Sequence, residues 1–193
     1  MAPTTSSDLP QRGSVADDIK MVALQLFARE GYGSTSIQQI ADAAGTGKSN
    51  VLYHFSSKEV LLEAILTPVV SEIEQVMLGE PAQAILRGDI AQFAEQFVDL
   101  LVRHPLEVNI FISQGQSLAQ IPSVARANDI IRRLIASPII GEHTSRQRIR
   151  HAVALGGAAY SLVAGYLWLE TAPEASELRD ELVAIVTEIL NNE

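Results

Sequence analysis

Five side chains after Gly45 have the chemistry of a nucleic-acid contact surface. A cationic amine, a small hydroxyl, an amide, a phenol and an imidazole can all reach base edges and phosphates when a short helix presents them to the major groove of DNA. The residues are Lys48, Ser49, Asn50, Tyr53 and His54. Taken alone, they would also fit an ordinary solvated helix face, so the elements that position them decide between the two interpretations.

The flanking residues predict two short helices joined by a tight turn, which is the arrangement of a helix-turn-helix. Ala41 is small enough for the second helix to cross close over the first, and Gly45 permits the turn. Ile40 and Val51 are expected to hold the pair together from inside. With these caps and spacings around the polar face, DNA binding is favoured over a solvated surface.

The segment from Ala44 to Ser49 also resembles the end of a phosphate-binding loop, G-x-x-x-x-G-K-[ST]. The first glycine of that motif would fall on Asp42, whose carboxylate would repel phosphates. The loop must also follow a strand, whereas residues 37–44 have helical spacing. A P-loop nucleotide hydrolase therefore stays only a minor alternative.

No other catalytic or metal-binding constellation is apparent. The chain has no cysteine, and no serine lies in a nucleophile elbow. The histidines lack metal-ligand spacing; they are His54, His104, His143 and His151. We expect a protein that is not an enzyme and that has no cofactor and no metal.

The net charge is −9 over 193 residues, and it is unevenly distributed. Residues 1–66 have a net charge of −2 and contain all three lysines, and the remainder has a net charge of −7. This excludes a globally basic nucleic-acid binder, because the acidic part repels polyanions, but it leaves a local contact surface near the N-terminus.

Two segments bear on localisation. Residues 1–13 are polar and contain two prolines, which predicts a disordered arm rather than a signal peptide. Residues 152–169 are uncharged but rich in alanine and glycine, and an amphipathic segment follows them closely. A helix buried in a bundle or a dimer fits them better than a membrane span, so we expect a cytoplasmic protein.

The helical periodicity continues along the chain, and no segment alternates like a strand. The first helix is expected to begin after Ser14 and to end at Gly31. Capping boxes formed by Thr35 with Gln38 and by Ser56 with Glu59 are expected to open the second and fourth helices, with a third at about residues 47–55. Further helices are expected at about 83–103, 106–117, 122–136, 144–169 and 175–191.

A proline interrupts the pattern of the fourth helix. Pro68 removes one backbone donor and clashes with the preceding turn, so a kink or a break is expected there. The predicted fold class is all-α, with an N-terminal three-helix helix-turn-helix domain and a C-terminal helical bundle domain.

Residues 14–66 resemble the DNA-binding domain of TetR-family transcriptional regulators. The resemblance implies about nine helices, the last two pairing across a homodimer, and a repressor that a small-molecule ligand releases from its operator. Thr46 and Gly47 depart from the family pattern, which weakens any transfer of a specific operator sequence. The matching positions are Phe27, Gly31, Tyr32, Thr35, Ile37, Ile40, Ala41, Ala44, Gly45, Leu52, Tyr53, Phe55, Lys58 and Leu62.

The resemblance also implies roles for single residues. Thr35 would donate to a phosphate, Lys48, Ser49 and Asn50 would read bases or anchor phosphates, and Tyr53, His54 and Lys58 would bind phosphates. Arg12 in the arm would enter the minor groove. Residues 1–13 would be the arm, 14–57 the DNA-binding domain, and 58–193 the ligand-binding and dimerisation domain.

In the C-terminal part the resemblance implies a pocket between helices and a dimer seam. A largely apolar ligand is favoured, because no pocket charge stands out. The expected pocket residues are Phe93, Phe97, Phe111, Gln114, Tyr160 and Trp168; each of them also fits a plain core position. Glycines and a serine every four residues are expected to form the seam with the last helix, through Gly157, Ser161, Gly165, Leu182, Ile185 and Ile189. A bundle that binds small molecules or protein without DNA is the other alternative.

Overall fold

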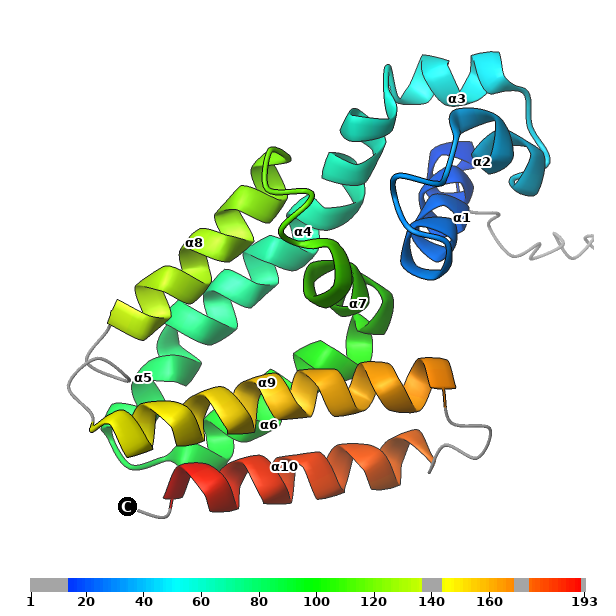
Figure 1. Ribbon diagram of the computed structural model, residues 1–193. Helices are drawn as coiled ribbons and strands as arrows, with labels where there is room; N and C mark the ends of the chain where they lie inside the picture. The colour runs from blue at the N-terminus through cyan, green and yellow to red at the C-terminus, as the bar shows by residue number, and fades with distance from the viewer. Residues whose placement is uncertain (1–13, 137–143, 169–173, 192–193) are drawn as a thin grey trace, which may run out of the picture.

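A computed structural model describes residues 14–136, 144–168 and 174–191, although not the side chains of residues 135, 136, 165–168 and 175. All elements in these ranges are helices, which confirms the all-α prediction (Figure 1). The single helix expected at about residues 83–103 is instead divided into α5 and α6, because Gly88 adopts φ +84° between them. The helices are α1 (Val15–Arg29), α2 (Ile37–Ala43), α3 (Lys48–His54), α4 (Lys58–Leu78), α5 (Glu80–Leu86), α6 (Ile90–Arg103), α7 (Pro105–Gln114), α8 (Pro122–Ala136), α9 (Ser145–Trp168) and α10 (Ala175–Asn191).

Side chains at the helix starts explain where the first helices begin. Ser14 caps α1 by accepting from the Asp17 amide, as expected. The capping box of α2 is formed by Ser36 and Gln39, and the cap of α4 is Ser57. Both lie one residue later than predicted. Two adjacent hydroxyl residues precede each of these helices: Thr35 and Ser36 before α2, and Ser56 and Ser57 before α4. Only the backbone conformation decides which hydroxyl reaches the free amides.

The long helix α4 connects the N-terminal helices with the rest of the molecule (Figure 1). It continues through Pro68 from Lys58 to Leu78, so the expected break at the proline is absent. Leu66, Val69 and Val70 flank the proline and are at most 4% exposed. Since α4 packs along α8 and α6, burial of such side chains offsets the roughly 3 kcal/mol that an interior proline costs.

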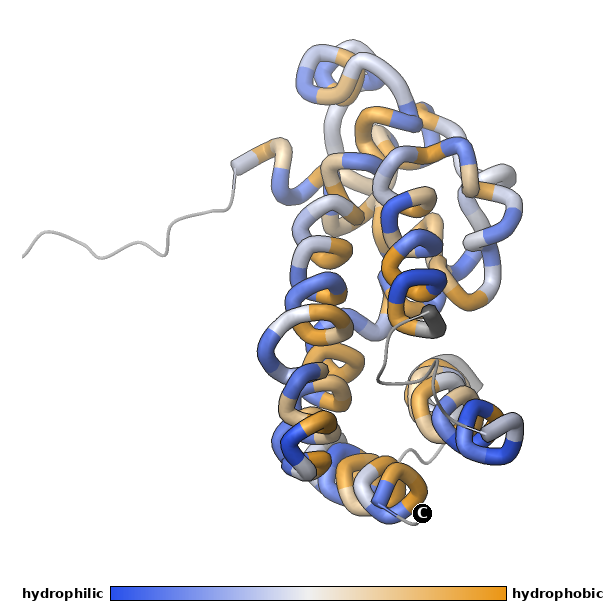
Figure 2. The backbone as a smooth tube through the Cα atoms, turned by 90° about the vertical axis from the view of Figure 1, so that its left-hand side faces the viewer, coloured by the Kyte–Doolittle hydropathy of each residue, from blue (hydrophilic) through white to orange (hydrophobic). Residues whose placement is uncertain are grey.

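Two apolar clusters form the interior. One joins the C-terminal half of α4 with α6, α8, α9 and α10. The other lies under α1, α2 and α3, and it includes Leu62 of α4 together with Ile110 of α7, Leu118, and Val124 of α8. Figure 2 shows apolar residues recurring on the inward sides of the helical turns. The proposed domain boundary at residues 57 and 58 is therefore crossed by a continuous core.

In the C-terminal part, α9 and α10 lie side by side and pack on α6 (Figure 1). The arm at residues 1–13 lies outside the described residues. Among the described residues, no helix is long and apolar enough to cross a membrane.

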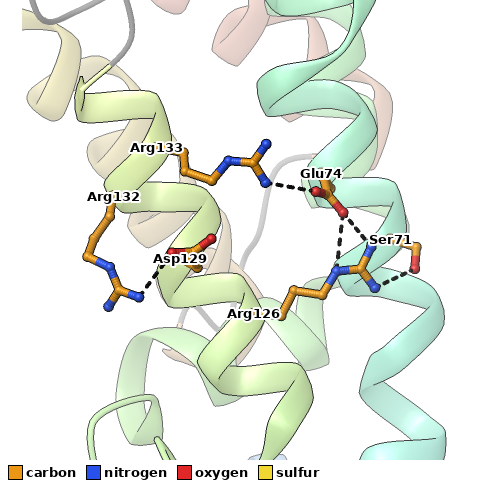
Figure 3. Close-up of polar contacts among 6 residues, drawn as sticks. All are labelled: Ser71, Glu74, Arg126, Asp129, Arg132 and Arg133. Carbon is orange, nitrogen blue, oxygen red and sulfur yellow. Dashed lines mark hydrogen bonds and ion pairs between the residues drawn. The ribbon is translucent and has the colours of Figure 1, made fainter.

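Surface ion pairs connect α4 with α8 (Figure 3). Glu74 of α4 accepts from Arg126 and, at 3.2 Å, from Arg133, both on α8. Arg126 also donates to the Ser71 hydroxyl at 3.3 Å. The hydrogen bond from Arg126 and the charges of both arginines hold the pKa of Glu74 below its ordinary value of 4.5.

This ion-pair cluster predicts a pH-dependent contribution to stability. A depressed carboxylate pKa stabilises the folded state above the unfolded-state value, and this stabilisation is lost as the pH falls through the lower folded-state value. Glu74→Gln should therefore lower the melting temperature slightly at pH 7, and the difference from wild type should vanish as the pH falls below about 4. Thermal unfolding followed by circular dichroism from pH 3 to 8 measures this.

Glu95→Gln is the matched control, because Glu95 is an exposed carboxylate on α6 for which the described residues show no ion pair. A constant difference between wild type and Glu74→Gln across the whole pH range would contradict the assignment.

Candidate nucleic-acid interface

Helices α2 and α3 form a helix-turn-helix at the end of the molecule away from α9 and α10 (Figure 1). Ile40, Ala41 and Val51 are fully buried between them. Gly45 adopts φ +63°, which favours glycine, and the Thr46 amide donates to the Ala41 carbonyl at 2.9 Å. The turn thus follows a helix rather than a strand, which excludes the phosphate-binding loop.

The outer face of α3 carries the predicted polar side chains. Lys48, Ser49, Tyr53 and His54 are exposed, and Tyr53 retains 83% of its accessible surface. Its ring packs edge to face on that of His54, with 5.3 Å between the centroids. Asn50 is partly buried, and its amide nitrogen donates to the Thr46 hydroxyl at 2.8 Å. The structure therefore brings these five residues together on one solvent-facing surface.

Thr35 is placed differently from the expected phosphate donor. It precedes α2, is 1% exposed, and donates its hydroxyl to the Gly31 carbonyl at 2.9 Å. A buried hydroxyl with an internal partner is not available to a phosphate. Thr35 instead closes the α1–α2 turn, and Ser36 caps the helix.

Lys58 ties the start of α4 to the α1–α2 turn. Its Nζ donates to the carbonyls of Tyr32 and Thr35 at 2.7 and 2.8 Å, and it lies 4.2 Å above the Tyr32 ring. Burial raises the pKa of the Tyr32 hydroxyl well above its ordinary range, so this ring stays neutral beneath the ammonium group. A lysine has three N–H donors, which leaves one of them for a phosphate.

The six expected pocket residues do not gather around one cavity. Phe93 and Phe97 stack on each other in the core, with 5.9 Å between the ring centroids. Tyr160 is 52% exposed on α9. Phe111 packs against both apolar clusters, and Gln114 forms hydrogen bonds with the N-terminal helices. The side chain of Trp168 lies outside the described residues.

Two cavities lie elsewhere along α4. A cavity of about 440 Å³ between α4, α5 and α6 is lined by polar groups that include Glu72, Asp99 and Arg103. A more open groove of about 550 Å³ lies between the first half of α4 and the segment at Ile121 and Pro122. The first cavity would suit a ligand with hydrogen-bonding groups, in contrast to the largely apolar one expected.

The expected dimer seam is partly exposed in this single chain. Gly157 and Ser161 lie on the surface of α9, and Ile185 of α10 is 48% exposed. Leu182 is different, because it is 6% exposed in the core of its own chain. The Ile189 carbonyl accepts from Arg150 at 2.6 Å. For Gly165, only the backbone is described.

Sequence reasoning missed Asn109 and the true role of Gln114 on α7. Both bond to backbone groups of residues 27–32, about eighty positions earlier in the chain. No local pattern could have indicated this, because the pairing depends on how α7 crosses α1.

Comparison with known proteins agrees with this geometry. Residues 21–65 match the family of bacterial regulatory proteins described as the tetR family. The chain is 29% identical over 126 residues to the HTH-type transcriptional repressor KstR2 of Mycolicibacterium smegmatis, covering 63% of this chain and 58% of that protein. It is 31% identical over 112 residues to the HTH-type transcriptional repressor NicS of Pseudomonas putida, covering 54% and 50%. The chain thus spans less than two thirds of the length of these relatives.

The fold is also shared with solved structures. A TetR-family transcriptional regulator from Bordetella parapertussis superposes with a TM-score of 0.62 at 23% identity, covering 91% of this chain and 95% of that one. The ketosteroid transcriptional regulator KstR2 of Mycobacterium tuberculosis gives 0.62 at 17% identity, covering 95% and 98%. At these identities the likeness concerns the fold.

The contacts of Lys58 predict that its removal destabilises the fold. Lys58→Met keeps the aliphatic stem but leaves the Tyr32 and Thr35 carbonyls without their charged donor, so the free energy of unfolding should fall by about 1–3 kcal/mol. Urea denaturation measures this. The control Lys48→Met removes an exposed ammonium group and should change the free energy by less than about 0.5 kcal/mol. Equal stability of the two variants would mean that the Lys58 bonds contribute nothing.

Proposed function

Because the chain belongs to the TetR family of bacterial regulatory proteins, we propose that it is a sequence-specific transcriptional repressor that works as a homodimer. The observation that carries this proposal is the exposed polar face of α3 on a rigid helix-turn-helix. A recognition helix of this type enters the major groove, and a two-fold dimer places two of them on two half-sites. The chain has no catalytic role in this proposal, and it works in the cytoplasm.

On DNA, Lys48, Ser49 and Asn50 begin the recognition helix and contact bases or the nearest phosphates. Tyr53 and His54, further along the exposed face, bind phosphates, and the third N–H of Lys58 supplies another phosphate contact. Few cations face DNA, so the affinity depends strongly on each of them.

Dimerisation is supported by exposed apolar surface on the last two helices. Ile149, Val153 and Tyr160 on α9 are 63%, 58% and 52% exposed, and Ile185 on α10 is 48% exposed. Apart from their chain neighbours and the adjacent backbone of α9, no atom of the described chain lies within 4 Å of a β-carbon built on Gly156 or Gly157. Exposed apolar side chains and open space at the glycines are both suited to close approach by the same helices of a second chain.

Release by a small-molecule effector is the remaining part of the proposal. Helix bundles hold such ligands between their helices, and the 440 Å³ cavity adjoins α4, which leads directly to the DNA-binding helices. An effector releases DNA only by binding the arrangement with misplaced recognition helices more tightly.

Genomic pull-down with sequencing of the bound fragments tests the proposal directly. A repressor should recover a small set of promoter sites that share an inverted repeat. Recovery of no enriched DNA would favour the alternative of a bundle that binds small molecules or protein without DNA.

Within such a site, wild type should discriminate against a wrong base at the position that Asn50 contacts by about 1–3 kcal/mol. Asn50→Ala should lose this discrimination at that one base pair of each half-site and keep the discrimination at the other positions. Fluorescence anisotropy on a series of singly substituted operators measures this. Thr46→Val is the matched control, because it removes the internal bond of Asn50 but keeps its amide. A uniform loss across all operators would remove Asn50 from the base-reading residues.

For the dimer, Ser161→Arg should give monomer or aggregate, because an unpaired charge enters the seam at a penalty of several kcal/mol. Light scattering and operator binding measure the outcome, and Ala91→Arg on the exposed side of α6 is the control. A stable, DNA-binding dimer of Ser161→Arg would place the interface elsewhere.

A further inference from the structure

Besides the apolar core that they share with α7 and α8, the N-terminal helices are attached to the rest of the described chain in two ways. The first is α4, which is continuous with both parts. The second is α7, where two amide side chains reach α1 across more than eighty positions of sequence. We call Asn109, Gln114 and their hydrogen bonds to α1 and Tyr32 the α7 clasp.

The α7 clasp satisfies backbone groups at the end of α1. Asn109 donates from Nδ2 to the Ala28 carbonyl at 2.8 Å, and Gln114 donates from Nε2 to the Phe27 carbonyl at 2.9 Å. The Gln114 Oε1 accepts from the Tyr32 amide at 2.7 Å. The last carbonyls of a helix have no partner within it, so α7 supplies what α1 cannot.

The surroundings keep these amide groups in place. Asn109 is 6% exposed, and Ile110 beside it is fully buried in the apolar cluster under α1. The Gln114 Oε1 lies 3.6 Å from where a β-carbon on Gly31 would stand, and Gly31 has φ +90°. Apolar contact is non-directional, whereas these hydrogen bonds weaken steeply when their geometry changes. The α7 clasp therefore fixes the direction of α1 relative to α7, and not merely its proximity.

We propose that Asn109 and Gln114 are positioning residues that set the angle of the recognition helix, and thereby the half-site spacing that the dimer accepts. Helix α3 packs on α1 and α2, so a rotation of α1 about α4 moves α3 with it. With the α7 clasp closed, each protomer presents α3 in one orientation. With the α7 clasp open, α4 and the apolar contacts of α7 and α8 still hold the N-terminal helices, but apolar contact is non-directional, so these helices rotate over a wider range. This inference rests on the proposed function.

Spacing is a sensitive readout because the duplex is helical. One added base pair moves a half-site by roughly 3.4 Å and turns it by about 35°. A dimer with rigidly held recognition helices cannot follow that change, whereas a loosely held pair can.

The experiment uses the full chain and operators derived from the recovered site. The central spacer is lengthened or shortened by one base pair, and affinities are measured by fluorescence anisotropy for wild type and for the double variant Asn109→Leu with Gln114→Met. Both replacements keep the approximate side-chain size but cannot form the hydrogen bonds. Gln116→Met is the matched control, because Gln116 is exposed just beyond α7.

Wild type and Gln116→Met should bind the altered spacings at least about tenfold more weakly than the native one. For the double variant, the three affinities should agree within about threefold. The inference would be overturned if the double variant lost affinity equally for all three operators and kept the wild-type preference for the native spacing. The α7 clasp would then only stabilise the fold. Absence of operator binding by wild type would instead overturn the proposed function, and the inference with it.

A second measurement does not need DNA and covers the case of a poorly folded double variant. The chain has no cysteine, so Gln25→Cys on the exposed side of α1 gives a single spin-label site in each protomer. The distance distribution between the two labels in the dimer should be narrow in the otherwise wild-type chain and broader with Gln114→Met alone. An unchanged distribution with unchanged melting temperature would also overturn the inference.

Discussion

Helices of seven residues do not hold their shape in water without support, because nucleation is costly and few internal hydrogen bonds follow it. Both α2 and α3 have this length, so everything that the outer face of α3 does depends on the apolar core beneath it. That core is built from fully buried side chains such as Phe27, Ile40 and Val51. Burying each of these contributes roughly 1.5–3 kcal/mol. The residues of α3 left facing outward are mainly polar and aromatic, together with Leu52, which is 38% exposed.

The core under α1–α3 is completed by residues from other parts of the chain. Ile110 of α7 and Val124 of α8 are fully buried in the same cluster as Leu62 of α4. Helices α1, α2 and α3 are therefore packed onto the C-terminal part rather than joined to it by a flexible linker. A rearrangement among α4, α7 and α8 must displace them, which is the physical requirement for any effector that acts from the body of the molecule.

Charge has a complementary role. The acidic remainder of the chain repels DNA, and several of its arginines are engaged in ion pairs on the surface. Arg126 and Arg133 bind Glu74, and Arg179 donates to Asp99 at 2.6 Å. Lys48, by contrast, extends into solvent at the start of α3. The distribution favours approach of DNA by way of α3.

The sequence by itself determined the all-α class, the helix-turn-helix and the outer face of α3, because these follow from local spacing of apolar residues, glycine and polar groups. It did not determine which of two adjacent hydroxyl residues caps α2. The family resemblance implied a phosphate contact for Thr35, whereas packing buries that hydroxyl against Gly31. Tertiary structure alone decided that Gln114 serves α1 rather than a ligand and that Leu182 lies in the core of its own chain. The reason is physical: an amide or a leucine has the same local signature in a pocket, a core or an interface, and only the crossing of distant helices gives it a partner.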